Sequence, residues 1–357
     1  MGSKIGGVLC FLFDTHFNQF SIIVEEILMF KKKVKVGFAF SSALLCSALV
    51  TNVYAIDVQP ISDQYFTKDR FKGKTLLITG GARGIGKASA IRASKEGANI
   101  VIADVLVKEG QDTVDEIQKM GGNAIFVQAD ISKTPACNLM VEETIKKYGQ
   151  LDGVLNAAGV MDAVPPDAAV NVEKQKKELF APIHEATDEY WNRTLAVNAT
   201  GMFCSLRSEL NQMVKQNKGG AIVNIGSIAG LTGLAGNPAY VASKHAVTGL
   251  TKNAAIDYAP YGIRVNSVNM AATETAMTDA AFKKVATLQK ERAKNPVLAK
   301  MPNTAMLKTQ SLLMFADSKH RMSTPAEQAS VILFLLSDEA SNITGATWAT
   351  DGGWTTF

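Results

Sequence analysis

The chain has 357 residues, of which 47% are hydrophobic and 20% charged, and its formal net charge is +4. This composition is typical of a globular protein, and the small positive charge gives no case for nucleic-acid binding, so we expect no nucleic acid among the partners. The four histidines show no metal-ligand spacing, which leads us to expect no metal site. They are His16, His184, His245 and His320.

The first 70 residues are set apart from the rest of the chain. A lysine-rich run precedes an apolar run of 15 residues, 36–50. This run is shorter than the stretch that a transmembrane helix usually needs. Val53 and Ala55 place small residues at positions −3 and −1 of a plausible cleavage site. This pattern predicts a signal peptide over residues 29–55, followed by a linker over residues 56–70.

A signal peptide predicts export to the periplasm, with no stable membrane span after processing. Two alternatives stay open: an uncleaved membrane anchor and a cytoplasmic protein. Met29 lies directly before the basic run, where a signal peptide is expected to start. We therefore hypothesise that Met29 is the true start, and that residues 1–28 are a mis-assigned extension of the reading frame or are disordered.

The first motif beyond this segment is a glycine-rich turn between a strand and a helix. Residues 74–79 predict a short apolar strand, and residues 87–97 predict a helix that ends at a glycine. These elements bind a dinucleotide pyrophosphate, because the glycines permit close backbone approach and the helix amino terminus supplies free N–H groups. The candidate cofactor-binding residues of the turn are Gly80, Arg83, Gly84, Ile85 and Gly86.

The second predicted strand, residues 99–103, ends at Asp104, which lies 18 residues past Gly86. An acidic residue that binds the adenosine ribose is expected about 20 residues after the glycine motif. Such a carboxylate accepts hydrogen bonds from the ribose hydroxyls and repels a 2′-phosphate, so we expect NAD as the cofactor, with NADP less favoured. Arg83 could weaken this preference. The alternative is that Asp104 only caps the strand.

Tyr240 alone among the seven tyrosines has a lysine or arginine four residues later, Lys244, and Ser227 precedes it by 13 residues. On a helix, this spacing puts Tyr240 and Lys244 on one face. We expect the lysine cation to lower the tyrosine pKa, so that Tyr240 passes a proton to or from a substrate oxygen held by Ser227. The alternative is an ordinary surface Tyr–Lys pair.

Together these motifs resemble the classical short-chain dehydrogenase/reductase family. The family's Thr-Gly-x-x-x-Gly-x-Gly motif matches the chain from Thr79 to Gly86, and ordered matches continue to Asp351-Gly352-Gly353 near the end. The resemblance covers the chain from about Phe71 to the carboxyl terminus. It implies an α/β fold: a single Rossmann-type, doubly wound domain over residues 71–357, with a seven-stranded parallel sheet.

The resemblance also implies roles for individual residues. Asn198, Ser227, Tyr240 and Lys244 match the catalytic residues of the family, and Asn198 is expected to hold a water in a proton relay from Lys244. Cofactor contacts are implied for the glycine turn, for Asp104, for Tyr240 and Lys244, and for further positions. The further positions are Asp130, Ile131, Asn156, Ala157, Gly159 and Thr275.

One stretch departs from the family pattern. After the sixth predicted strand, residues 264–268, the family usually has a turn with the sequence Asn-Pro-Gly, whereas this chain has Asn269-Met270-Ala271. In the family that turn packs against the nicotinamide ring, so the replacement bears on the pose of the ring.

The residues and the resemblance predict an NAD(P)-dependent oxidoreductase that interconverts a secondary alcohol and a ketone by hydride transfer. Residues 276–324 lie where the family has its substrate lid and contain five methionines, so we expect a bulky apolar or cyclic substrate such as a steroid, terpenoid or diol. A surface insertion or an oligomer contact is the alternative for this segment. Two other functions stay open: a dinucleotide-binding sensor or scaffold without turnover, and an epimerase or dehydratase on the same fold.

The remaining expectations concern assembly and disulfides. Because family members are usually dimers or tetramers, a homodimer or homotetramer is expected, and Trp348, Trp354 and Phe357 are candidate interface residues. Removal of the signal peptide leaves Cys137 and Cys204. Both lie in predicted helices, so we expect no stabilising disulfide.

Overall fold

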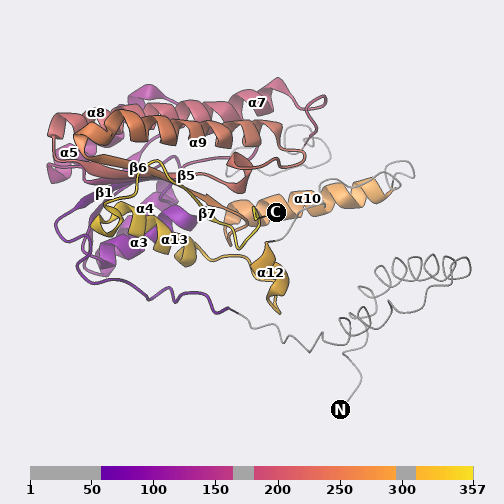
Figure 1. Ribbon diagram of the computed structural model, residues 1–357, viewed down its shortest axis with the longest axis horizontal. Coiled ribbons are helices and arrows are strands. Elements are labelled where there is room, and N and C mark those ends of the chain that lie inside the picture. Colours follow the sequence, from indigo (N-terminus) through magenta and orange to yellow (C-terminus); the bar gives the residue numbers. More distant parts are fainter. Residues whose placement is uncertain (1–57, 164–180, 295–310, 357) are drawn as a thin grey trace, which may run out of the picture. The chain divides into compact units, whose positions relative to one another are not determined.

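Residues 58–163, 181–294 and 311–356 are described by the computed structural model, and Figure 1 shows the arrangement of their helices and strands. They belong to the unit Ile56–Phe357. The predicted signal peptide and the segment before it lie outside the described residues, as do parts of the predicted lid. Among the residues that are described, no helix has both the length and the apolar character needed to cross a membrane.

A seven-stranded parallel sheet forms the centre of the domain, as predicted, with the strand order β3-β2-β1-β4-β5-β6-β7. The chain changes direction across the sheet between β3 and β4, so β1 and β4 are the neighbours at the point where such sheets bind ligands, outside the carboxyl ends of their strands. The strands are β1 (Thr75–Thr79), β2 (Asn99–Asp104), β3 (Asn123–Gln128), β4 (Gly153–Asn156), β5 (Gly220–Ile225), β6 (Ile263–Met270) and β7 (Thr347–Thr350).

Helices cover both faces of the sheet: α3, α4 and α13 lie on one face, and α5, α8 and α9 lie on the other, where α7 packs on α9 (Figure 1). The main helices are α3 (Gly84–Lys95), α4 (Val107–Lys119), α5 (Thr134–Tyr148), α7 (Asp188–Leu195), α8 (Met202–Gln216), α9 (Pro238–Tyr258), α10 (Ala276–Lys294), α12 (Leu312–Ala316) and α13 (Pro325–Leu336). A π-helical segment, η1 (Ala196–Gly201), joins α7 to α8, and the short 3-10 segments are η2 (Ile228–Gly230), η3 (Ala259–Tyr261) and η5 (Asp338–Ala340).

Successive residues of a strand pack into two different cores. In β1, Leu76 and Ile78 join the buried cluster under α3, α4 and α13, whereas Leu77 joins the cluster under α5, α8 and α9. Burial of each such side chain contributes about 1.5–3 kcal/mol to stability, which explains why β1 is apolar at consecutive positions. Cys137 and Cys204 lie in the second cluster as buried free thiols.

Two element boundaries differ from the prediction at the ligand-binding edge. β6 continues to Met270, because it pairs with β7 as far as Met270 opposite Thr350. Asn269 and Met270 are therefore buried strand residues, and the prediction that they form a turn was wrong. The helix after the glycine turn begins at Gly84 rather than at residue 87, so Gly84, Ile85 and Gly86 form its first turn.

Residues 58–70, which form part of the predicted linker, contain no helix or strand and lie against the domain. Arg70 forms an ion pair with the buried Glu96, with 3.3 Å between Nε and Oε2. The backbone N–H of Thr67 donates to the other carboxylate oxygen of Glu96 at 2.9 Å. Arg321 Nη2 donates to the carbonyl oxygen of Val58 at 2.9 Å. The segment therefore contacts the domain at both of its ends.

Candidate active site

The carboxyl ends of the parallel strands bring the predicted site residues to one edge of the sheet. The glycine turn follows β1, Asp104 ends β2, and Asn156 ends β4. Ser227 lies two residues beyond the end of β5, and Thr275 lies beyond the end of β6. Residues that are far apart in the sequence thus meet on this edge, as the parallel arrangement requires.

The glycine turn approaches the turn after β4 so closely that side chains cannot fit between them. A Cβ atom placed on Gly80, whose φ is +67°, would lie 2.6 Å from the backbone nitrogen of Ala158. A Cβ atom on Gly86 would lie 2.2 Å from the carbonyl oxygen of Gly80. The bare backbone next to the amino terminus of α3 matches what a pyrophosphate needs, because N–H groups and the helix dipole both favour an anion there.

Asp104 holds the glycine turn in place. Its Oδ2 accepts a hydrogen bond from the backbone N–H of Ala82 at 3.0 Å, and its Oδ1 accepts one from Leu106 N–H at 3.1 Å. The carboxylate therefore caps local backbone, as the alternative interpretation proposed, at the position where a ribose-binding acid is expected.

Arg83 forms an ion pair with Glu109 in the first turn of α4. The hydrogen bond from Arg83 lowers the pKa of Glu109. Glu109 was not predicted to be a site residue, although its place in the first turn of the helix after β2 was a signal that could have identified it. The pair keeps a carboxylate close to the one basic side chain of the glycine turn.

Asn156 links the turn after β4 to a buried carboxyl group. Its Nδ2 donates to Glu209 Oε2 at 2.9 Å and to Asn224 Oδ1 at 3.1 Å. Glu209 lies on α8 and is fully buried. Burial raises the pKa of Glu209 to about 8, and the hydrogen bond from Asn156 opposes that rise. Glu209 was not predicted to be a site residue, because a lone glutamate in a helix is usually solvated.

The same turn is bound to β1 and to the catalytic candidates. The backbone N–H of Ala157 donates to the carbonyl oxygen of Thr79 at 3.1 Å. A Cβ atom on Gly159 would lie 3.2 Å from Asn198 Oδ1 and 3.7 Å from Lys244 Nζ. Gly159 therefore lies directly beside two of the four residues that were predicted to be catalytic.

Those four residues are buried close to one another. Tyr240 and Lys244 lie on α9 and are 9% and 5% exposed, so they are not the ordinary surface pair of the alternative interpretation. Lys244 Nζ lies 5.7 Å from the centroid of the Tyr240 ring and donates to the carbonyl oxygen of Ile225 at 2.8 Å. The Ser227 side chain opposes the burial-induced rise in the pKa of Tyr240, and its Oγ accepts from Ala229 N–H at 3.1 Å.

Asn198 lies in the π-helical segment η1 and ties this segment to the loop after β4. Its Oδ1 accepts from the backbone N–H of Val160 at 2.8 Å, and its Nδ2 donates to the carbonyl oxygen of Val160 at 2.8 Å. Nδ2 also donates to Ser243 Oγ at 3.0 Å. A π-helical turn often occurs at a functional site. Here it points the Asn198 amide at the loop beside Lys244.

The electrostatics of the pair differ from the prediction. Burial raises the pKa of Tyr240, and the hydrogen bond with Ser227 opposes that rise. Burial lowers the pKa of Lys244 to about 8. The net direction for Tyr240 is therefore opposite to the one expected from Lys244 alone: desolvation of the phenolate dominates, and the ammonium group is bound to the Ile225 carbonyl.

The other predicted cofactor residues lie around this centre. Thr275 Cγ2 would be 3.2 Å from a Cβ atom on Gly84, so the start of α10 packs on the glycine turn. Ile131 is buried against Gly201. Asp130 is exposed, and its Oδ1 accepts from Ser132 N–H at 3.0 Å.

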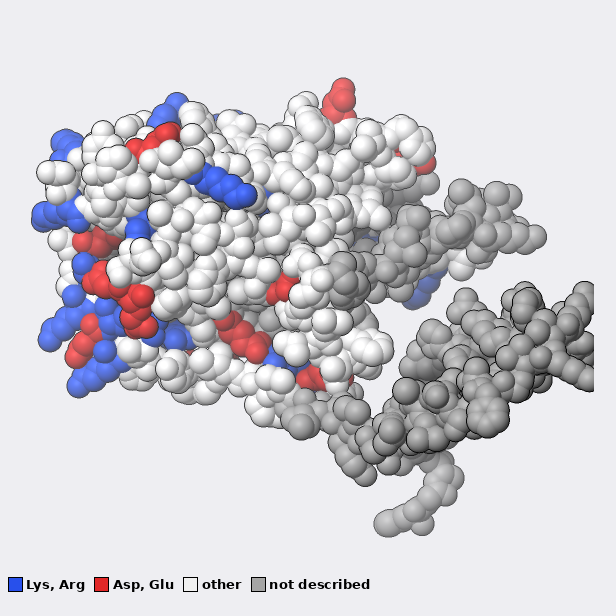
Figure 2. All heavy atoms as spheres, in the orientation of Figure 1, with Lys and Arg blue, Asp and Glu red and all other residues white. Residues whose placement is uncertain are grey.

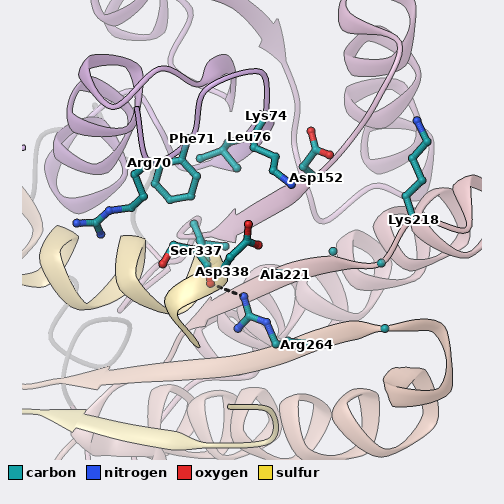
Figure 3. A pocket seen from close by; sticks show the side chains of 14 residues that line it. Arg70, Phe71, Lys74, Leu76, Asp152, Lys218, Ala221, Arg264, Ser337 and Asp338 are labelled. Atoms are coloured by element: carbon teal, nitrogen blue, oxygen red, sulfur yellow. Dashed lines mark hydrogen bonds between the residues drawn. The ribbon is translucent and has the colours of Figure 1, made fainter. Parts of the chain in front are cut away.

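A polar hollow on the domain lies at the opposite edge of the sheet, where strands begin (Figure 3). Lys74 precedes β1, Asp152 precedes β4, and Arg264 is the second residue of β6. Figure 3 shows the Arg264 guanidinium donating to the carbonyl oxygen of Ser337, at 2.8 Å. The lining of this hollow contains none of the predicted site residues, so it is separate from the edge described above.

The chain matches the family model for short chain dehydrogenases over residues 74–286. It is 37% identical over 295 residues to a 3beta-hydroxysteroid dehydrogenase of Mediterraneibacter gnavus, covering 82% of this chain and 98% of the relative. It is 33% identical over 287 residues to a cyclohexanol dehydrogenase of Acinetobacter sp., covering 80% and 97%. The solved structure of levodione reductase is similar, with a TM-score of 0.66 and 27% identity, covering 80% of this chain and 99% of that one.

The chain therefore belongs to the short-chain dehydrogenase family, as its motifs implied, and it is an oxidoreductase of the kind that uses a nicotinamide nucleotide. The match covers the whole sheet except β7, and it includes the glycine turn and all four of the catalytic candidates.

Replacement of Glu209 by glutamine tests the buried carboxyl group. Because the folded-state pKa of about 8 lies above the ordinary value of 4.5, the folded protein keeps a proton that the unfolded chain releases. The resulting stability is fully present below the unfolded pKa and is lost as the pH rises to about 8. We expect Glu209→Gln to remove this loss, so that its free energy of unfolding falls less than that of the wild type between these two pH values.

Denaturant unfolding across this pH range measures the difference, with Glu142→Gln at an exposed position on α5 as the matched control. The control should follow the wild-type pH dependence. Parallel pH curves for the wild type and Glu209→Gln would show that Glu209 is ionised in the folded protein and would contradict the assignment.

Proposed function

We propose that this protein interconverts a cyclic secondary alcohol and its ketone, with NAD as the preferred cofactor and Tyr240 as the general acid and base. The observation that carries the proposal is the buried meeting of Asn198, Ser227, Tyr240 and Lys244 beside the turn after β4, which itself packs on the glycine turn. A protein that only binds a dinucleotide has no need of this arrangement.

The cofactor is assigned to the carboxyl edge of the sheet. The glycine turn and the amino terminus of α3 would hold the pyrophosphate, and Asp104 would hold the adenosine ribose. Further contacts would come from the turn after β4 and from Asp130, Ile131 and Thr275. When bound, the nicotinamide accepts a hydride from the alcohol carbon or returns one to the ketone. The backbone that the glycines leave bare supports this fit.

Side chains of the protein would carry out the proton transfer. In alcohol oxidation Tyr240 takes the proton from the substrate oxygen, while Ser227 holds that oxygen by a hydrogen bond. Tyr240 is protonated in the resting site, because burial raises its pKa, so it must lose a proton before it acts as a base. Lys244 suits a proton relay near neutral pH, because burial lowers its pKa to about 8. Asn198 would hold the water of that relay.

The substrate is proposed to be apolar and cyclic. Relatives that are named for a hydroxysteroid and for cyclohexanol support this choice. So do the large apolar side chains that α10 and α12 expose, which include Met277, Phe282, Leu312 and Phe315. On the face shown in Figure 2, charged side chains are densest at the end of the domain away from α10. Exposed apolar side chains of this kind favour an apolar ligand.

Substitution of Tyr240 by phenylalanine tests the general acid and base. We expect Tyr240→Phe to lower kcat by about 10²–10⁴-fold, the usual contribution of such a group. NADH affinity should stay close to wild type, since the ring remains. Steady-state oxidation of cyclohexanol and a fluorescence titration with NADH provide the two measurements.

Tyr258→Phe serves as the control, because Tyr258 is the last residue of the same helix, α9. It should leave kcat unchanged. Wild-type turnover by Tyr240→Phe would refute the role assigned to Tyr240.

Substitution of Asp104 by asparagine tests the cofactor preference. Asparagine keeps an oxygen acceptor for the glycine turn and removes the charge that would repel a 2′-phosphate. We expect the ratio of NADH affinity to NADPH affinity to fall by about tenfold or more, equivalent to about 1.4 kcal/mol. Asp257→Asn, at an exposed aspartate on α9 outside the proposed cofactor site, is the matched control. An unchanged ratio in Asp104→Asn would show that another group selects the cofactor.

A further inference from the structure

A buried ion pair joins helix α10 to the loop after β4. Lys284 Nζ donates to Asp162 Oδ2, although the two residues are 122 positions apart in the sequence. Their side chains are 9% and 12% exposed. The neighbouring Lys283 on the same helix is exposed, so the inward direction of Lys284 is specific to that position. Sequence analysis placed α10 in the substrate lid but singled out neither partner.

The acidic partner of this pair lies in the loop that borders Tyr240. Ala163, the next residue after Asp162, packs in a small buried cluster with Tyr190 and Ala239. The hydroxyl oxygen of Tyr190 accepts from the backbone N–H of Tyr240 at 3.4 Å. A short run of direct contacts therefore connects the ion pair to the backbone of the proposed general acid and base.

The loop from Gly159 to Ala163 is held at two points. Asn198 binds both the N–H and the carbonyl of Val160, and Lys284 binds Asp162 two residues later. The helix that carries Lys284 is itself anchored at its start, where Thr275 packs on Gly84 of the glycine turn. Helix α10 therefore spans from the proposed pyrophosphate site to the loop beside Tyr240.

A buried ion pair is an expensive way to gain stability, because both charges lose their hydration. Removal of one partner leaves the other charge buried and unpaired, which is strongly unfavourable. Such a pair therefore holds two elements in one defined arrangement better than an apolar contact, which tolerates sliding. Here the ion pair fixes the distance between α10 and the 159–163 loop.

We propose that Lys284 is a positioning residue for the substrate: its ion pair with Asp162 fixes α10 against the 159–163 loop and so forms one wall of the substrate cleft beside Tyr240. The expected effect of this ion pair on substrate binding rests on the proposed function. Loss of the pair would loosen the wall and weaken substrate binding, while the reacting groups on α9 and the cofactor site at the glycine turn would stay in place.

The experiment compares Lys284→Met, which keeps a chain of similar length without the charge, with Lys283→Met as the matched control one residue earlier. We expect Lys284→Met to raise KM for a cyclic alcohol by about tenfold or more, with kcat within about threefold of wild type. The dissociation constant for NADH should not change in either variant. A merely structural defect would lower kcat and cofactor affinity together and would contradict the proposal.

Two further variants keep the test decisive if Lys284→Met folds poorly. In Asp162→Asn/Lys284→Met no buried charge is left unpaired, so the double variant should fold, and it should still raise KM because the link between α10 and the loop is lost. The reversed pair Asp162→Lys/Lys284→Asp should recover part of the wild-type KM. An unchanged KM in the double variant or in a folded Lys284→Met would overturn the inference while the proposed function stands.

Hydrogen exchange provides a readout that does not need turnover. Amides of the 159–163 loop and of the start of α10 should exchange faster in Lys284→Met than in Lys283→Met and the wild type. Equal exchange in all three proteins would overturn the positioning role. Faster exchange in a protein that oxidises no alcohol would support the contact and would count against the proposed function alone.

Discussion

The close approach of two backbone turns, at Gly80 and at Ala157–Ala158, is the constraint on which the site depends. It brings the turn after β1 against the turn after β4, so no side chain fits between them. From this contact the structure extends in two directions. Asn156 reaches the buried carboxyl of Glu209, and Gly159 lies against Asn198 and Lys244. The edge proposed to bind the dinucleotide and the residues assigned to proton transfer thus meet at these two turns.

Burial governs the chemistry of this segment. It raises the pKa of Tyr240 and Glu209 and lowers that of Lys244, so each group is pushed toward its neutral form. Charge on Tyr240 or Lys244 therefore costs free energy unless a partner compensates it. In the proposed reaction the lysine relay and the hydrogen bond from Ser227 lower that cost at the moment when the tyrosine gives up its proton.

Sequence motifs predicted the sheet, the glycine turn and the meeting of Tyr240 with Lys244, because those features depend on local spacing and on strand ends that are parallel. The pairing of Asn156 with Glu209 and of Asp162 with Lys284 could not be predicted, since each joins elements whose contact is set by packing across the fold. The shift in the Tyr240 pKa has the opposite direction to the predicted one. Sequence spacing shows which groups are near one another, but it does not show how much hydration each group loses on burial. β6 was predicted too short because its last residues are held by β7, which comes much later in the chain.

The central claim is direct transfer of hydrogen between a carbinol carbon and the nicotinamide. Its most direct test supplies NAD and cyclic alcohols, cyclohexanol among them, that carry deuterium on the carbinol carbon, and measures deuterium in the reduced cofactor by mass spectrometry. The account predicts one deuterium in each reduced cofactor molecule and a matching amount of ketone. Reduced cofactor without deuterium, or tight NADH binding with no reduction by any alcohol tested, would contradict it.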